Sequence, residues 1–361
     1  MHAVHQFIPS FSPRDAIGPH ARRVQGVLRR MGLESEIYVD EAWPELAHSC
    51  RKYDTYRGRA GEVLLYQAST GSRLAPWLTA RDQPLFVNYH NVTPPDSLER
   101  WEPWLADEVA DGRRQIEKLA PATSFAISDS SYNHHEVETW GYRAGTVAPL
   151  LVDFEALDAA PDPTTSAWLQ RLREKGPNLV FIGRIVPNKA QHHLVKALAA
   201  YHRLYGPGAT LHLVGGVSSP RYLNAVRRLV AELGLVESVD VAGMVSDAEK
   251  AAYLSQADAF VCLSDHEGFC APLLEAMHHD VPVIGFNAAA VPETLAGGGL
   301  ILGSRDPLTV AAAVRRVVTD GNARAVMVEA GRRRVADFAL PVTEARFAEA
   351  VTAGLDLLGG T

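Results

Sequence analysis

The feature that most constrains the fold of this chain is a regular alternation of short apolar runs with segments of helical spacing. The runs are rich in β-branched and aromatic residues, as expected of strands. Strands that alternate with helices are typical of parallel sheets whose two faces are covered by helices. The expected strands lie at residues 2–8, 35–40, 62–68, 84–90, 124–128 and 146–152, and then at residues 178–183, 210–216, 238–243, 259–264, 282–286 and 299–303.

The two sets of strands predict two domains. A chain of 361 residues exceeds the roughly 250–300 residues at which single cores stop growing. Residues 153–166 are rich in proline and acidic residues, so we expect a linker there. The sequence therefore predicts an α/β protein with two doubly wound, Rossmann-like units, at residues 1–152 and 153–340, facing a cleft that holds the ligand. A last helix, residues 341–361, has an apolar stripe of Val342, Phe347, Val351 and Leu355 that needs a partner surface.

Composition excludes several classes of protein. The net charge of −7 gives no general attraction to nucleic acid or anionic lipid. Three cysteines, Cys50, Cys262 and Cys270, are too few for a disulfide framework, and no metal-ligand spacing joins them. The first ten residues lack the features of a signal peptide, and no segment approaches the ~18 apolar residues of a membrane span. We therefore expect a cytoplasmic protein.

Two cations follow the first strand of the second set, in the sequence FIGRIVPNKA. Arg184 and Lys189 come after this strand, where a ligand of a doubly wound sheet is expected. Arginine binds a diphosphate through two hydrogen bonds, and lysine acts as a point charge. The same pair would neutralise a departing nucleoside diphosphate. Spacing alone leaves open that they are two surface cations of a loop.

A second motif, SDHEGFCAPLLEAM, begins at Ser264 and holds two glutamates. Gly268 permits a sharp turn, and Pro272 suits the first turn of a helix whose free amide groups, around residues 269–273, form a seat for an anion. Glu275, about one turn further along, is expected to accept hydrogen bonds from a ribose, and Glu267 to meet hydroxyl groups of a transferred sugar. Alternatively, both glutamates are solvated surface charges.

These motifs resemble those of a known family. EGFCAPLLE has the two glutamates of retaining glycosyltransferases of family 4, which have the GT-B fold, and GRIVPNK is similar to their diphosphate-binding motif. The following segment VPVIGFNAAAVPETL, and DAIGPH and NYHNVTP in the first half, also resemble family positions. The resemblance implies that residues 1–152 form the acceptor-side domain, that residues 153–340 bind a nucleotide sugar, and that the last helix packs on the first domain.

The resemblance also assigns roles to residues. It implies that Arg184 and Lys189 hold the donor diphosphate, that Glu275 holds the ribose, and that Met244 and Val245 flank the base. His90 would reach the donor sugar from the first domain, although taken alone it also fits a histidine at a strand end. The implied catalytic residues are His90, Arg184, Lys189 and Glu267, and the implied donor-binding residues are Gly18, Arg184, Lys189, Met244, Val245, Glu267, Gly268, Phe269, Cys270, Ala271 and Glu275. No metal and no cofactor are implied beyond the nucleoside diphosphate sugar as co-substrate.

We therefore expect a retaining, metal-independent hexosyltransferase that uses a nucleotide-sugar donor and a hydroxyl acceptor, which is a glycan, a lipid-linked sugar or a small molecule. The helix at residues 20–32 carries four arginines around an apolar stripe, which allows at most a peripheral membrane contact. A nucleotide-sugar epimerase or phosphorylase, or a non-catalytic nucleotide-sugar-binding protein, are the alternatives. A dehydrogenase is disfavoured because no Gly-x-Gly-x-x-Gly follows the first strand.

Overall fold

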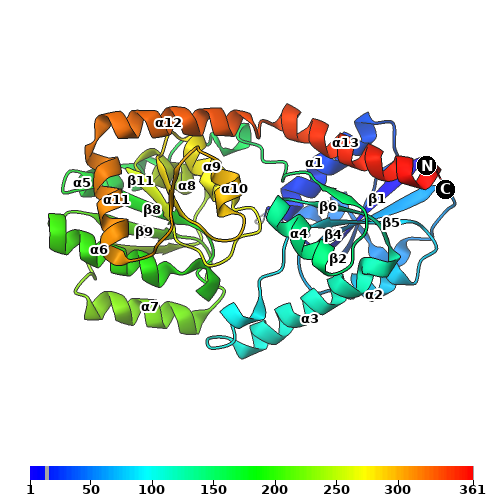
Figure 1. Ribbon diagram of the computed structural model, residues 1–361, viewed down its shortest axis with the longest axis horizontal. Helices are drawn as coiled ribbons and strands as arrows, with labels where there is room; N and C mark the ends of the chain where they lie inside the picture. The colour runs from blue at the N-terminus through cyan, green and yellow to red at the C-terminus, as the bar shows by residue number, and fades with distance from the viewer. Residues whose placement is uncertain (13–15, 361) are drawn as a thin grey trace. The chain divides into compact units, whose positions relative to one another are not determined.

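The computed structural model describes residues 1–12 and 16–360, which form two compact units (Figure 1). Unit 1 comprises Met1–Pro95, Trp104–Val152 and Phe338–Thr361, and unit 2 comprises Asp96–Pro103 and Asp153–Asp337. Each unit is built around one sheet whose described strand pairs are parallel. The predicted α/β fold class, with two parallel-sheet domains, is confirmed.

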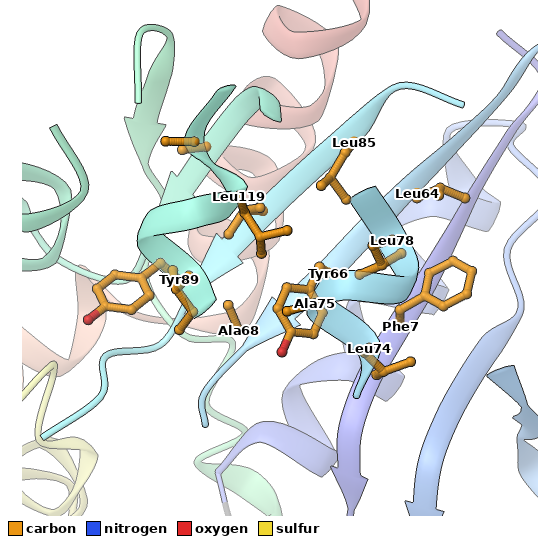
Figure 2. Packing of buried hydrophobic residues seen from close by; sticks show 14 of the residues in the cluster. Phe7, Leu64, Tyr66, Ala68, Leu74, Ala75, Leu78, Leu85, Tyr89 and Leu119 are labelled. Carbon is orange, nitrogen blue, oxygen red and sulfur yellow. The ribbon is translucent and has the colours of Figure 1, made fainter. Parts of the chain in front are cut away.

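Unit 1 contains a seven-stranded sheet in the order β3-β2-β1-β4-β5-β6-β7. Alternate residues of β4 face different cores: Leu64 and Tyr66 pack in one cluster, and Val63 and Leu65 pack in another, so both faces of the strand are buried. Figure 2 shows the first cluster, in which side chains of α2 and α3 meet Phe7, Tyr66 and Tyr89. The elements of unit 1 are β1 (Ala3–Phe11), α1 (Ile17–Arg30), β2 (Ile37–Ala42), β3 (Arg51–Lys52), β4 (Glu62–Ala68), α2 (Leu74–Thr79), β5 (Leu85–Tyr89), α3 (Pro103–Leu119), β6 (Thr123–Ser128), α4 (Ser131–Thr139), β7 (Gly145–Val147) and α13 (Leu340–Gly359).

Unit 2 contains a six-stranded sheet in the order β10-β9-β8-β11-β12-β13. Successive strands are added on one side of β8 up to β10 and then on its other side from β11 onward, so the strand order reverses between the neighbours β8 and β11. In a doubly wound fold, ligands bind in the crevice at the carboxyl ends of two such strands. The elements of unit 2 are α5 (Pro163–Arg173), β8 (Asn178–Ile182), α6 (Gln191–Tyr205), β9 (Thr210–Val214), α7 (Pro220–Glu232), β10 (Val239–Gly243), α8 (Asp247–Ser255), β11 (Ala259–Cys262), α9 (Ala271–His278), β12 (Val283–Phe286), α10 (Val291–Leu295), β13 (Leu300–Leu302), α11 (Pro307–Thr319) and α12 (Gly321–Ala336).

Every expected strand segment overlaps a strand of the structure, but two local predictions differ from it. The two-residue strand β3 was not predicted, because Arg51 and Lys52 are exposed and carry no apolar signal. The expected linker at residues 153–166 contains the start of α5, where the Asp162 side chain accepts a hydrogen bond from the amide of Thr165. Aspartate followed by proline is common both in linkers and at the start of helices, and in the structure it starts a helix.

One segment of the first half of the chain belongs to unit 2 instead of a continuous first domain. In residues 96–103, Glu102 is 4% exposed and accepts hydrogen bonds from the Ser219 hydroxyl at 2.7 Å and the Arg221 amide at 3.3 Å. The ring of Trp101 packs edge-on against Tyr222, with centroids 5.3 Å apart. The carboxylate thus caps the N-terminus of α7, where negative charge is stabilised. This anchor joins residues too distant in the sequence for local patterns to reveal it.

Helix α13, red in Figure 1, packs within unit 1 beside α1. Phe347 and Val351 are fully buried there, and Leu355 is packed against the same cluster. Val342 is 38% exposed, so its predicted place in the apolar stripe is wrong, and Leu340 packs against the cluster instead. The stripe thus finds its partner surface on the sheet of unit 1 and on α1.

We expect Gly354→Ala in α13 to destabilise the protein. A Cβ at this position would lie 2.7 Å from the ring of Phe86 and 3.1 Å from Phe125, and neither buried ring can move freely. Overpacking of this kind costs about 1–3 kcal/mol, which exceeds the gain of up to about 1 kcal/mol for alanine over glycine in a helix. Urea unfolding measures the change, and Gly359→Ala, with nothing within 4 Å, is the matched control. Equal stability of the two variants would contradict this packing.

Candidate functional site

The candidate site lies in unit 2, where the loops after β8 and β11 begin. These strands pair in parallel register, with Leu179 opposite Ala259 and Val180 opposite Phe260. Their carboxyl ends therefore lie side by side, and the loops that carry the two predicted motifs leave the sheet at the same edge. Both loops belong to the part of a doubly wound sheet where ligands bind.

Asn188 ties the two loops together. Its main-chain carbonyl accepts a hydrogen bond from the amide of Asp265 at 2.8 Å, and its side-chain amide donates to the carbonyl of His266 at 3.3 Å. Asn188 is 3% exposed, so these hydrogen bonds are shielded from water. The next residue along each loop, Lys189 and Glu267, is thereby brought to its partner.

Lys189 and Glu267 form an ion pair at the carboxyl ends of the strands. Nζ of Lys189 lies 2.5 Å from Oε2 of Glu267, and the two side chains are 15% and 8% exposed. A pair so shielded retains much of its charge attraction, but each charge loses hydration. The structure thus brings together two predicted site residues that lie 78 positions apart.

The loop after Glu267 is fixed by α10 and by its own backbone. The Glu267 carbonyl accepts a hydrogen bond from the amide of Ala290 at 3.1 Å, and the Phe269 carbonyl accepts one from the Thr294 hydroxyl at 2.5 Å. Cys270 precedes α9 with φ 68°, a left-handed conformation that is unusual for a residue other than glycine. Such strain is kept only where the surroundings enforce it, and it is common at binding sites.

The predicted anion seat at the start of α9 is smaller than expected. Pro272 has no amide hydrogen, and the amide of Leu273 donates to the carbonyl of Cys270 at 3.1 Å. Of the five residues at positions 269–273, these two therefore cannot offer a main-chain amide to an anion as predicted. The expected contact with a phosphate rests on the amides that precede Pro272.

Glu275 lies on α9 and pairs with a residue that the sequence analysis did not select. Its Oε2 is 3.2 Å from Nζ of Lys250 on α8, and the two side chains are 14% and 21% exposed. Met244 and Val245 lie just before this helix, and Met244 is 64% exposed. The predicted base-flanking residues therefore lie between β10 and α8, and the predicted ribose-binding residue lies within α9, joined to α8 by this ion pair. Arg184, at the end of β8, is exposed and available to an anion.

Two cysteines lie beside the Lys189–Glu267 pair. Sγ of Cys262, at the end of β11, is 4.0 Å from Sγ of Cys270, and 3.3 Å from the hydroxyl of Ser264. The hydrogen bond from the Cys270 thiol lowers the pKa of Cys262, and the same bond together with burial raises the pKa of Cys270. The spacing of the cysteines in the sequence gave no sign of this proximity, because the two sulfur atoms meet only where the loop between them folds back.

His90, in unit 1, is held in a buried polar network. Nδ1 of its ring is 2.8 Å from Oδ2 of Asp129, and Nε2 is 2.6 Å from Oε1 of Gln67. The amide of Gln67 donates to Gln6 at 2.7 Å, and the amide of Gln6 donates to the carbonyl of Ala21 at 2.9 Å. Since a main-chain carbonyl can only accept, it orients both glutamine side chains. Nε2 of His90 therefore carries a proton.

This network limits what His90 can offer to a ligand. Its side chain is 1% exposed, whereas the residue as a whole is partly exposed, so the accessible atoms belong to the main chain. Burial raises the pKa of Asp129, and burial lowers that of the nearby His20 well below its ordinary value. The catalytic role of His90 stays a prediction. A contact with a sugar would come from its main chain unless the network opens.

Gly18 lies in unit 1 at the start of α1, close to its own preceding strand. A Cβ at this position would lie 1.9 Å from the carbonyl oxygen of Ser12. The absence of a side chain is thus required by packing within unit 1, which accounts for the glycine without a ligand. The predicted donor contact stays a prediction, and Asp15, the first residue of the DAIGPH motif, lies outside the described residues.

The arginines of α1 are partly engaged within unit 1. Arg30 lies 2.6 Å from Glu344 of α13, and Arg29 donates to the carbonyl of Ser35 at 2.9 Å. A peripheral membrane contact through this helix would have to compete with these partners, and it stays a prediction. Within residues 1–12 and 16–360, no helix has the length and apolarity to cross a membrane.

The second half of the chain is similar to a known protein family. Residues 165–334 match the family described as glycosyl transferases group 1. This range includes the loops after β8 and β11, with Arg184, Lys189, Glu267 and Glu275. The resemblance to glycosyltransferases of the GT-B fold is confirmed by this match and by the relatives and structures described next.

Glycosyltransferases of bacteria are among the similar curated proteins. A GDP-mannose-dependent alpha-(1-6)-phosphatidylinositol monomannoside mannosyltransferase of Mycobacterium tuberculosis is 36% identical over 234 residues, which are 62% of this chain and 60% of that protein. A D-inositol 3-phosphate glycosyltransferase of Frankia alni is 28% identical over 63% of this chain and 58% of that protein. The chain therefore spans about three fifths of the length of these relatives.

Solved structures match nearly the whole chain. Alr3699/HepE of Anabaena, crystallised with UDP and glucose, has a TM-score of 0.73 and 16% identity, and the match covers 98% of this chain and all of that one. A sucrose-phosphate synthase of Thermosynechococcus elongatus has a TM-score of 0.75 and 19% identity, with full coverage of both chains. At sequence identities this low, the structural similarity establishes the fold of this chain and nothing about its activity.

Proposed function

We propose that this protein is a retaining glycosyltransferase that moves a hexose from a nucleoside diphosphate sugar to an acceptor hydroxyl without a metal ion. The observation that carries the proposal is the shielded Lys189–Glu267 pair at the carboxyl ends of β8 and β11, with Arg184 and Glu275 on the adjoining segments of the same unit. The family match covers all four residues. Cations and acids placed in this way suit the diphosphate, the sugar and the ribose of one ligand.

The proposed roles follow from charge. Arg184 and Lys189 stabilise the diphosphate as the bond to the anomeric carbon breaks, so that protein cations supply the charge that a metal ion supplies elsewhere. Glu267 binds hydroxyl groups of the sugar. When the diphosphate attracts Lys189 away from the ion pair, the carboxylate of Glu267 becomes free to accept hydrogen bonds from these hydroxyl groups. The acceptor attacks from the face that the diphosphate leaves, and a phosphate oxygen takes the acceptor proton. The anomeric configuration is then retained.

GDP-mannose is the first donor to test, because the mannosyltransferase of M. tuberculosis is named for its dependence on it. That name also suggests a lipid-linked sugar as an acceptor, and the name of the F. alni relative suggests a phosphorylated inositol. The alternatives on this fold are a nucleotide-sugar epimerase and a non-catalytic nucleotide-sugar-binding protein.

One experiment separates these possibilities. The purified chain is mixed with guanosine, uridine, adenosine and thymidine diphosphate sugars, with EDTA present, and thermal stabilisation and slow hydrolysis of the donor are measured. We expect one base to be preferred and its sugar to be released as free sugar, with retained configuration by NMR. Stabilisation without release indicates a binding protein, and conversion of the sugar while still attached indicates an epimerase. Activity that is lost in EDTA contradicts metal independence.

A further inference from the structure

Three potential metal ligands meet beside the proposed donor site. Cys262 ends β11, Cys270 precedes α9, and Glu267 lies in the loop between them. One ligand atom from each lies within 4.8 Å of the other two, and the three residues are buried, with exposures of 0%, 8% and 7%. The strand, the left-handed turn at Cys270 and the hydrogen bond from Ala290 to the Glu267 carbonyl fix these positions from the backbone.

The distances suit a tetrahedral ion with sulfur ligands. Zinc–sulfur bonds of ~2.3 Å at a tetrahedral angle place two sulfur atoms roughly 3.8 Å apart. The sulfur atoms of Cys262 and Cys270 are 4.0 Å apart, so both could reach such an ion with a shift of a few tenths of an ångström. A carboxylate oxygen of Glu267 is close enough to be the third ligand. Two thiolates favour a soft ion such as Zn²⁺ over Mg²⁺ or Ca²⁺.

The charges around this position also balance. Two thiolates and the Glu267 carboxylate carry three negative charges, and a divalent cation with Lys189 carries three positive ones. Since Lys189 contacts Oε2 of Glu267, the other carboxylate oxygen can turn to an ion without breaking the pair. A neutral set of charges is much less costly to bury than an unbalanced one.

We propose that Cys262, Cys270 and Glu267 form a binding site for a thiophilic divalent cation, such as Zn²⁺, and that the bound cation inhibits sugar transfer. The binding follows from this geometry alone. The inhibition rests on the proposed function, because it requires Glu267 and the backbone at Cys270 to contact the donor. The cation is an inhibitor in this scheme, and it takes no part in the transfer itself.

Binding is tested on the full chain, kept reduced and freed of metal by a chelator. We expect one Co²⁺ per chain to give a thiolate-to-cobalt absorption band and tetrahedral d–d bands, and Zn²⁺ to abolish both. Cys262→Ser and Cys270→Ser should each weaken zinc binding, measured by competition with a chromophoric chelator, by at least about 100-fold. Cys50→Ser is the matched control and should bind zinc as the unmodified chain does. Unchanged affinity in either of the first two variants overturns the site.

A measurement on the unmodified chain guards against variants that fail to fold. X-ray absorption at the zinc edge, with one equivalent of Zn²⁺, should show two sulfur ligands at about 2.3 Å. One sulfur ligand or none overturns the site.

Inhibition is measured separately, as release of sugar from the preferred donor. Zn²⁺ should suppress this release in the unmodified chain and in Cys50→Ser, and Cys262→Ser should resist it in proportion to its lost affinity. Zinc binding without loss of release overturns the inhibitory role while the site stands. If no donor is accepted, the proposed function fails, and the cobalt and zinc titrations still decide the site.

Discussion

Replacing Lys189 with alanine is expected to lower the rate of sugar transfer by roughly 100- to 1,000-fold, the usual effect of removing one group that stabilises transition-state charge. The effect should appear in kcat, because the charge on the departing diphosphate grows as the sugar bond breaks. Steady-state assays with the preferred donor measure it. Lys196→Ala, an exposed lysine of α6 in the same unit, is the matched control and should leave the rate unchanged.

The structure adds a second consequence to this substitution. The side chain of Glu267 is only 8% exposed in the ion pair, so a carboxylate that loses Lys189 as its partner should cost the protein about 1–3 kcal/mol of stability. Lys189→Ala combined with Glu267→Gln removes the unpaired charge and should recover most of the stability. Lys189→Ala should also weaken binding of the nucleoside diphosphate, since a cation that contacts it is lost, and this weaker binding should persist in the double variant. Recovery of that affinity together with stability would show that Lys189 serves only to hold Glu267 in place.

Replacing Glu275 with alanine is expected to weaken binding of the nucleoside diphosphate by about 10- to 100-fold, as hydrogen bonds from the ribose to a charged acceptor are lost. Calorimetry with the diphosphate of the preferred base measures this. The 2′-deoxy form of the same nucleotide should bind the unmodified chain less tightly than the ribose form, and the difference should shrink in Glu275→Ala. A difference that persists would rule out a bond between Glu275 and the 2′-hydroxyl, and unchanged affinity for both would refute the ribose role.

Lys250→Met is the matched control for this prediction. It removes the ion pair at 3.2 Å but keeps the carboxylate of Glu275. If Glu275 binds ribose, this variant should lose much less affinity than Glu275→Ala. If Glu275 only anchors α8 to α9 through Lys250, the two variants should lose affinity and stability to the same extent.

The fold and the place of the donor motifs were predictable from local patterns. Short apolar runs such as residues 178–183 and 259–264 are strands in the structure, because strands buried on both faces of a parallel sheet need continuous apolar sequence. Gly268 and Pro272 marked the turn and the helix that follow β11. These signals depend on residues within a few positions of one another, so they can be read along the chain.

The partners of the site residues were not predictable in the same way. Lys250 and Asn188 look like ordinary helix and loop residues in the sequence. Their contacts arise only where the folded chain brings Lys250 of α8 to Glu275 of α9, and the loop of Asn188 to the loop that follows β11. For His90 the sequence suggested a side chain that reaches a ligand, whereas the structure turns the ring toward Asp129 and Gln67. A buried imidazole satisfies its nitrogen atoms inside the unit, since unpaired polar groups are costly there.

Local sequence patterns were enough to predict two parallel α/β units, the positions of Arg184, Lys189 and Glu267 after strand ends, and the helix that carries Glu275. Which charges pair, and that Sγ of Cys262 lies 4.0 Å from Sγ of Cys270, can be seen only in the folded chain. Strands and helices form according to the spacing of apolar residues along the chain, so they leave a local pattern. Ion pairs and ligand clusters depend instead on which strands become neighbours and on the loops that then meet at one edge of the sheet.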